Sequence, residues 1–129
     1  MRTLLATTAI VALLVTSGST VPAQTTATRE VMRVKLGHAG QVLEALMTSD
    51  FTQLEREAAS LAALTGRPAW AVLTSERYVR YSDTFRRAAE DLAAFAEERD
   101  SEAAMRAYVA LTLSCYQCHS YVKGARVAQ

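Results

Sequence analysis

The chain has 129 residues, which is short enough for a single domain once an export signal is removed. It carries 14 lysines and arginines against 13 aspartates and glutamates, so the overall charge gives no indication of nucleic-acid binding. Only 5 glycines and 2 prolines are present while alanine, leucine, glutamate and arginine are abundant, and this composition predicts an all-α protein.

The N-terminal residues have the layout of a secretory signal peptide. Arg2 precedes an uncharged, mostly apolar run over residues 4–15, and Ala23 supplies a small residue at a cleavage point. The run is shorter than the roughly 20 residues that a membrane-spanning helix needs, and an uncleaved anchor is the alternative. We therefore predict a signal peptide over residues 1–23. The exported, periplasmic domain covers residues 24–129 and is not an integral membrane protein after cleavage.

Apolar spacing and capping residues predict four helices. Asp50, with Gln53 three residues later, and Ser75 have the positions of N-caps, while Gly66 and Gly124 have the positions of helix stops. The expected helices run from about residue 28 to 47, from 50 to the stop at 66, from 75 to about 96, and from 100 or 101 to the stop at 124. Short connections between long helices make neighbours antiparallel, so we predict an all-α, antiparallel, up-down-up-down four-helix bundle.

Each predicted helix has an apolar face whose residues recur every three or four positions. In chain order these expected inner-face residues are Met32, Leu36, Ala39, Leu43 and Leu46; Phe51, Leu54, Ala58, Leu61 and Leu64; Tyr78, Ser82, Phe85, Ala89, Leu92 and Ala96; and Met105, Tyr108, Leu111, Cys115 and His119. Met47 and Met105 are expected to fill the core at the end of the bundle farthest from His119.

The motif Cys-x-x-Cys-His at residues 115–119 is the attachment signature of a c-type haem. Positions i, i+3 and i+4 share one face of a helix, so both thiols and the imidazole reach the same flat object. A thioredoxin-like centre needs a βαβ context. A zinc site needs four ligands, although only His38 remains as a nitrogen donor, and a disulfide across one helical turn is strained. The motif predicts one covalently bound haem c, held by Cys115 and Cys118, with His119 as the proximal iron ligand.

Met32 is the candidate for the other axial position. In the predicted bundle the start of the first helix lies level with the end of the last, so Met32 and His119 have the same height. Met47 lies about 22 Å farther along the axis at 1.5 Å per residue. His38 points about 120° away from Met32 and is expected on the solvated surface. Lys35 lies within a turn of Met32 and could approach the haem edge, although we expect an exposed lysine. Met32 either ligates the iron or covers an open iron face as a steric lid.

A single C-x-x-C-H at the end of the last of four helices resembles the class II c-type cytochromes, which comprise cytochrome c′ and its low-spin, methionine-ligated relatives. Lys123, four residues after the histidine, and Met32-Arg33 near the start of the first helix add to this resemblance. It implies that Met32 lies over the distal face of the haem. It also implies an arginine that binds a haem propionate. The family often places that arginine four residues before the methionine, and Arg29 lies three before. Family members often pair through their first two helices, so a homodimer is implied as well.

Two functions follow from these expectations. With histidine and methionine both on the iron, the protein carries single electrons between redox partners and has no substrate site. With an open iron face, it binds a small gas such as nitric oxide, and Met32 is a steric lid. No carboxylate or histidine can be placed on the distal face as a general acid, so we do not expect an enzyme.

Charged residues are segregated along the predicted bundle. The haem end carries Arg29, Arg33, Lys35, Arg67, Arg77, Arg80, Lys123 and Arg126 against Glu30 and Glu76. The far end carries Glu44, Asp50, Glu55, Glu57, Glu90, Asp91, Glu97, Glu98, Asp100 and Glu102 against Arg56, Arg99 and Arg106. We therefore expect a redox partner that presents an acidic docking surface to the haem end.

Overall fold

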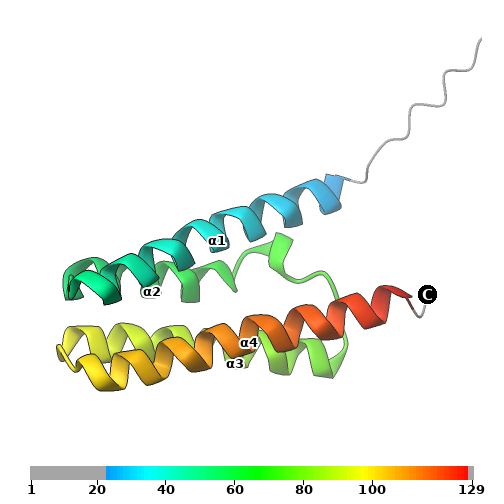
Figure 1. The fold of residues 1–129 in the computed structure, drawn as a ribbon. Coiled ribbons are helices and arrows are strands. Elements are labelled where there is room, and N and C mark those ends of the chain that lie inside the picture. Colours follow the sequence, from blue (N-terminus) through cyan, green and yellow to red (C-terminus); the bar gives the residue numbers. More distant parts are fainter. Residues whose placement is uncertain (1–22, 128–129) are drawn as a thin grey trace, which may run out of the picture.

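The computed structural model describes residues 23–127, which form four helices and one short 3₁₀ turn (Figure 1). In chain order these are α1 (Ala23–Thr48), α2 (Phe51–Leu64), η1 (Pro68–Trp70), α3 (Glu76–Glu97) and α4 (Ser101–Val127). No strand occurs within this range, so the expected all-helical fold is confirmed. None of the helices in the described range is both long enough and apolar enough to span a bilayer. The predicted signal peptide lies outside the described residues, apart from Ala23.

Side-chain caps begin three of the helices. Asp50, Ser75 and Asp100 each accept a hydrogen bond from the backbone amide three residues later, at 2.9, 3.3 and 2.9 Å. Each bond satisfies an amide that has no partner within its own helix. The predicted starts of α2, α3 and α4 are therefore confirmed.

The α1–α2 and α3–α4 connections share one backbone geometry. Ser49 and Arg99 adopt the left-handed conformation, with φ of 56° and 57°. The amides of the following residues, Asp50 and Asp100, donate to the carbonyl oxygens five residues earlier, at 2.9 and 3.0 Å. In each connection a left-handed residue ends one helix and an aspartate begins the next. The predicted stop at Gly124 is wrong, because its φ is not positive and α4 continues past it.

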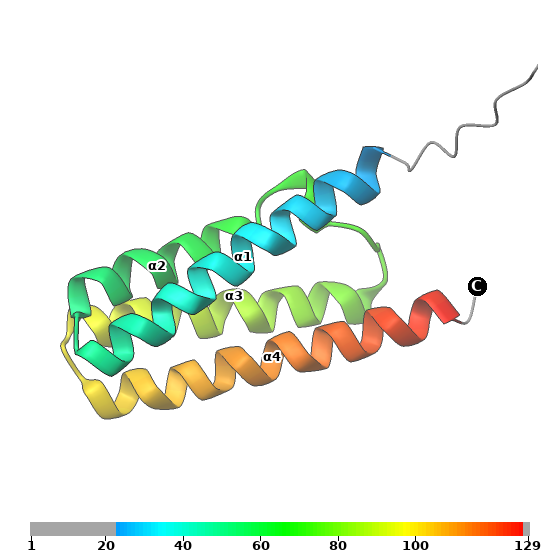
Figure 2. The same ribbon diagram turned by 45° about the horizontal axis from the view of Figure 1, so that its top comes forward.

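The four helices pack in chain order. α1 packs on α2, α2 on α3 and α3 on α4, whereas α1 and α4 make few contacts with each other. Figures 1 and 2 show the start of α1 and the end of α4 at one end of the molecule, with the α1–α2 and α3–α4 connections at the other. η1 contacts α1. Residues far apart in the sequence therefore meet at the end of the molecule where α1 begins.

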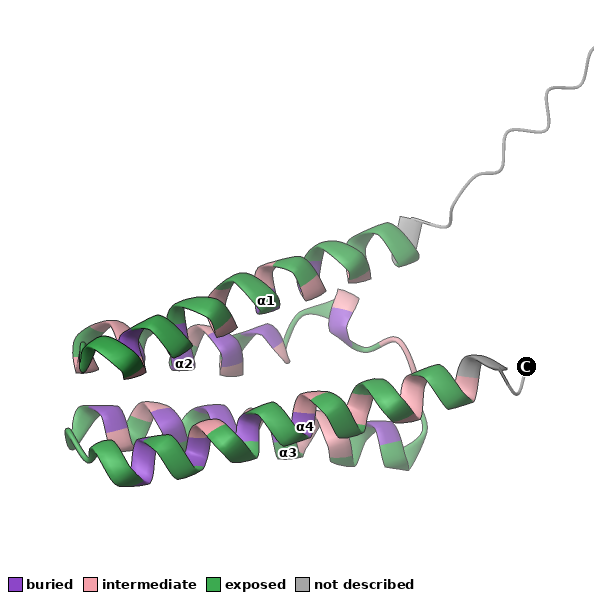
Figure 3. Cartoon of the chain, in the orientation of Figure 1, coloured by how far each residue is buried: buried purple, intermediate pink, exposed green. Residues whose placement is uncertain are grey.

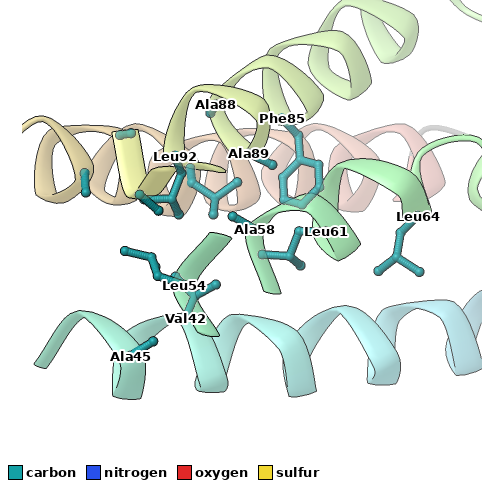
Figure 4. Packing of buried hydrophobic residues seen from close by; sticks show 14 of the residues in the cluster. Val42, Ala45, Leu54, Ala58, Leu61, Leu64, Phe85, Ala88, Ala89 and Leu92 are labelled. Atoms are coloured by element: carbon teal, nitrogen blue, oxygen red, sulfur yellow. The ribbon is translucent and has the colours of Figure 1, made fainter. Parts of the chain in front are cut away.

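The hydrophobic core extends between the helices, and its largest members come from α2 and α3 (Figures 3 and 4). The largest fully buried hydrophobic side chains are Phe85, Leu54, Leu61, Leu92 and Val42. The expected inner faces of α2 and α3 are confirmed, with Phe51 and Ser82 half-buried at their edges.

The buried face of α1 differs from the expected one. Val31, Val42 and Ala45 are buried, whereas Leu36 is 75% exposed and Leu43 is also exposed. The other residues expected on the inner face are half-buried. α1 carries apolar residues on two sides, and its packing against α2 and η1 turns the valine side inward. The prediction that Leu36 and Leu43 face the core is wrong.

Small residues form most of the buried face of α4. The buried residues are Ala103, Ala104, Ala107, Leu111 and Ser114. Alanines let α4 pack closely against α3. Met105 is exposed, as is Met47 near the end of α1. The prediction that these two methionines fill the core is therefore wrong.

Candidate functional site

A cavity of about 500 Å³ lies at the end of the molecule where α1 begins and α4 ends. This volume is in the range of about 300–1,000 Å³ that is common for small-molecule sites. Its wall combines apolar side chains, including Trp70 and Val122, with three basic ones, Arg29, Lys35 and Lys123. Among the residues that the structure describes, none of those that line the cavity carries a carboxylate. The cavity therefore suits a largely apolar ligand that carries negative charge.

The C-x-x-C-H motif lies within α4, one wall of this cavity. Cys118 and His119 line the cavity, and Cys115, one turn earlier, packs against the core. Both cysteines are free and half-buried, so they are not joined in a disulfide. Because α4 is helical throughout this stretch, the two thiols and the imidazole have the i, i+3, i+4 spacing of one helix face.

Partial burial changes the protonation of both cavity-lining residues of the motif. Burial raises the pKa of the Cys118 thiol, and the Lys35 charge offsets part of this increase. Burial lowers the pKa of the His119 imidazole, and the Lys35 charge lowers it further. His119 is nevertheless exposed, so the prediction that it lies on the inner face of the last helix is wrong. A lowered pKa keeps the imidazole neutral near pH 7, which is the form that binds a metal ion.

Met32 and Arg29 come from α1 and line the same cavity as Cys118 and His119. Met32 is half-buried, and Arg29, three residues earlier, is exposed. The structure thus places four of the five site residues expected from the sequence around one cavity. The fifth, Cys115, lies one helical turn away.

Lys35 lies in the cavity wall, the alternative that its place within a turn of Met32 left open. It was expected on the surface, but it is only 7% exposed. Its Nζ lies 4.0 Å from the ring centroid of Phe85 and 4.9 Å from that of Trp70, so the ammonium is stabilised by two aromatic faces. No ion pair joins Lys35 to a carboxylate within residues 23–127. The sequence feature that could have indicated the burial of Lys35 is its position four residues after Val31, on the side of α1 that is buried.

Trp70 of η1 forms another part of the cavity wall, and three hydrogen bonds hold this turn. Thr28 Oγ1 of α1 donates to the carbonyl of Ala69 at 3.0 Å. The Tyr78 hydroxyl donates to the carbonyl of Trp70, and the Trp70 indole donates to Ser82 Oγ at 3.0 Å. Burial raises the pKa of Tyr78, so the hydroxyl remains a donor. Bonds from both α1 and α3 therefore fix the position of this wall.

His38 does not belong to the cavity wall. Its Nδ1 lies 2.6 Å from Oε2 of Glu57 on α2, and Glu57 is only 5% exposed. The His38 side chain is half-buried rather than fully solvated as the sequence predicted. His38 thus links α1 to α2, away from the Cys-x-x-Cys-His motif.

Comparison of the chain with models of protein families, with curated proteins and with solved structures finds no match in any of the three. Within residues 23–127, no group of three or more His, Cys, Asp and Glu side chains is arranged to hold a metal ion by itself. A haem iron needs no such cluster, because the porphyrin supplies four of its ligands. The functional argument therefore depends on the cavity and on the residues that line it.

Proposed function

We propose that the protein is an exported, periplasmic mono-haem c-type cytochrome that carries single electrons between redox partners. In this proposal the haem lies within an antiparallel, up-down-up-down four-helix bundle. The main support is that Met32 of α1 and Cys118 and His119 of α4 line one cavity, although they are far apart in the sequence. Met32 and Cys118 also pack against the core, but their meeting with an imidazole at one cavity fits the donor groups that haem c requires.

The side chains around the cavity fit haem c in both donor type and charge. Cys115 and Cys118 would form the thioethers, and His119 would bind the iron through its neutral imidazole. Met32 would supply a thioether sulfur on the opposite face. Arg29, one of three basic side chains in the cavity wall, would pair with a propionate, as the resemblance implies. Bound haem supplies a one-electron couple. The chain's residues would fix its orientation and limit its contact with water.

A second function is supported by the position of Met32. Met32 is half-buried in the cavity wall, and a side chain in this position could also cover the iron without binding it. In this alternative the iron is five-coordinate and binds a gas such as nitric oxide, and Met32 acts as a steric lid. The absorption spectrum of the purified oxidised and reduced protein separates the two functions, because the spin state distinguishes six-coordinate from five-coordinate iron.

Haem attachment is tested by the mass of the intact exported protein. The wild-type mass should include one haem, Cys115→Ser and Cys118→Ser should each lose at least one thioether, and His119→Ala should lose the proximal ligand. His38→Ala is the matched control, because it removes the only other histidine and should leave attachment and spectrum unchanged. A wild-type protein whose mature mass contains no haem would contradict the proposed function.

The charge pattern supports a partner with an acidic docking surface. Arg29 and Lys123 are exposed and line the cavity, so a charged partner would approach near the haem. Reversal of Lys123 and Arg126 to glutamate should slow association without altering the haem spectrum; the Arg126 side chain lies outside the described residues. The exchange rate should also fall as salt is raised toward the range where the Debye length is about 8 Å. Rates that respond to neither change would exclude electrostatic steering at this end.

A further inference from the structure

Lys35 is a buried cation that no acidic side chain balances. It is 7% exposed, and among residues 23–127 its ammonium has no ion pair and no hydrogen bond. The rings of Phe85 and Trp70 lie beside it, with their centroids 4.0 and 4.9 Å from Nζ. Aromatic faces attract a cation but accept no conventional hydrogen bond, so the three N–H groups of the ammonium lack acceptors.

The space beside this ammonium is the cavity. Lys35 lines it together with Met32, Cys118 and His119. Water in an empty cavity can accept hydrogen bonds from the ammonium, but a ligand that fills the cavity displaces this water. A buried charge without acceptors is unfavourable. None of the described residues that line the cavity carries a carboxylate, so the ligand itself must supply the replacement acceptor.

The other two basic residues of the cavity wall do not need such a partner. Arg29 and Lys123 are exposed, so water hydrates their charges and an ion pair with either contributes little. Lys35 lies six residues, or about 9 Å, farther along α1 than Arg29, and opposite charges attract more strongly in a buried site than in water. Lys35 is therefore the cation that selects an anionic group inside the cavity.

We propose that Lys35 binds a carboxylate of the ligand inside the cavity, and that for haem c this carboxylate is one of the two propionates. The choice of a propionate rests on the proposed function, because the propionates are the only acidic groups of haem c. A carboxylate offers two acceptor oxygens as well as the opposite charge. Arg29 remains available to the second propionate, at the exposed part of the wall. The chain would thus hold haem from two helices, through thioethers from α4 and through an ion pair from α1.

Vibrational spectra distinguish a direct bond from the effect of a distant charge. Resonance Raman spectra of the purified, reduced holoprotein include a bending mode of the haem propionates, whose frequency falls when the carboxylate loses a hydrogen-bond donor. Lys35→Met should lower this frequency, because methionine keeps an unbranched apolar side chain but has no ammonium. Lys35→Leu should lower it to the same extent, and Lys35→Arg should keep the wild-type frequency because a guanidinium also donates.

Arg33→Met is the matched control. It removes one positive charge from the same helix, but Arg33 is exposed, pairs with Glu30 at 3.1 Å and does not line the cavity. The control should keep the wild-type propionate frequency. Circular dichroism verifies that each variant is folded. A propionate frequency that is the same in the wild type, the control and both uncharged Lys35 variants would overturn the proposal.

Formate, the smallest carboxylate, tests whether the bound anion belongs to the haem. A propionate that occupies Lys35 leaves no site for formate, so a formate titration should change the absorption spectra of the wild type and of Lys35→Met equally or not at all. Formate binding that occurs in the wild type and is lost in Lys35→Met would reveal an unoccupied ammonium and would overturn the assignment to a propionate. The mass of each sample is measured as well. A protein without haem contradicts the proposed function, whereas a haem-loaded protein whose propionates do not respond to Lys35 contradicts this inference alone.

Discussion

Loss of the Glu57 carboxylate should lower the free energy of unfolding through one interhelical contact. Glu57 is 5% exposed on α2, and its Oε2 accepts a hydrogen bond from His38 Nδ1 of α1 at 2.6 Å. Its Oε1 accepts from Arg56 Nε at 3.0 Å. Because the Arg56 side chain is largely solvated, that second contact contributes little. The bond to His38 is therefore the one that determines the effect.

The magnitude follows from the type of bond. A hydrogen bond to a charged group contributes about 1.5–3 kcal/mol, and glutamine keeps the shape and one acceptor. Glu57→Gln should therefore lower the free energy of unfolding by about 1–2 kcal/mol at pH 7. Urea unfolding followed by circular dichroism measures this value. A double-mutant cycle with His38→Gln should give a coupling energy of at least about 0.5 kcal/mol.

The contribution of Glu57 should also depend on pH. The His38 hydrogen bond lowers the pKa of Glu57 below its usual value of 4.5, although burial opposes this effect. A lowered folded-state pKa means that the stabilisation is complete above 4.5 and is lost as the pH falls through the lower folded value. Asp83 has a lowered pKa as well, so the test is the difference between wild type and variant. A variant with unchanged stability at pH 7, or with the wild-type loss of stability on acidification, would refute this account.

Three further results are expected. Met32→Ala should abolish the weak long-wavelength methionine-to-iron band of the oxidised protein and raise its affinity for carbon monoxide. A wild-type protein that is already high-spin and binds gas freely would favour the alternative function. Lys35→Met should lower the reduction potential in a spectroelectrochemical titration, because a buried cation disfavours the additional positive charge of ferric haem, while Lys35→Arg should keep it. An unchanged potential in Lys35→Met would show that this charge does not act on the haem. Phe85→Ala should lower the free energy of unfolding by about 3–5 kcal/mol, because the substitution leaves a cavity in the core. Val79→Ala on the surface should change the free energy of unfolding by less than about 0.5 kcal/mol. Similar losses in a urea titration of the two variants would contradict the assignment of Phe85 to the core.

Features set by local chemistry could be predicted from the sequence. The caps at Asp50, Ser75 and Asp100 depend on one side chain and one amide three residues later, so the sequence contains all that they need. The inner faces of α2 and α3 could also be predicted. Each of these helices lies against two neighbouring helices and has only one apolar face, so the sequence leaves no choice of which face is buried. The prediction of a helix end at Gly124 was wrong, because a glycine permits a left-handed backbone conformation without requiring it.

Features set by the packing of distant segments could not be predicted. α1 has one apolar side with Val31 and Val42 and another with Leu36 and Leu43, and the sequence alone does not say which side meets α2. Lys35 was expected to be exposed, as lysines usually are, although it is buried in the cavity wall on the valine side of α1. At the candidate site, the Cys-x-x-Cys-His motif could be recognised locally. The approach of Met32 to this motif could also be predicted, because it requires only that the start of the first helix and the end of the last lie at one end of the molecule.

Trp70 is an intrinsic fluorescent probe of the cavity. It is the only tryptophan in the chain, it is buried, and it lies in the wall of the cavity. A porphyrin absorbs light at the wavelengths that tryptophan emits, so a haem in the cavity would quench this fluorescence by energy transfer. With a single emitter, the remaining intensity measures the fraction of chains whose cavity is empty. The yield of haem loading could thus be followed in purified samples of defined chain concentration, without any added dye.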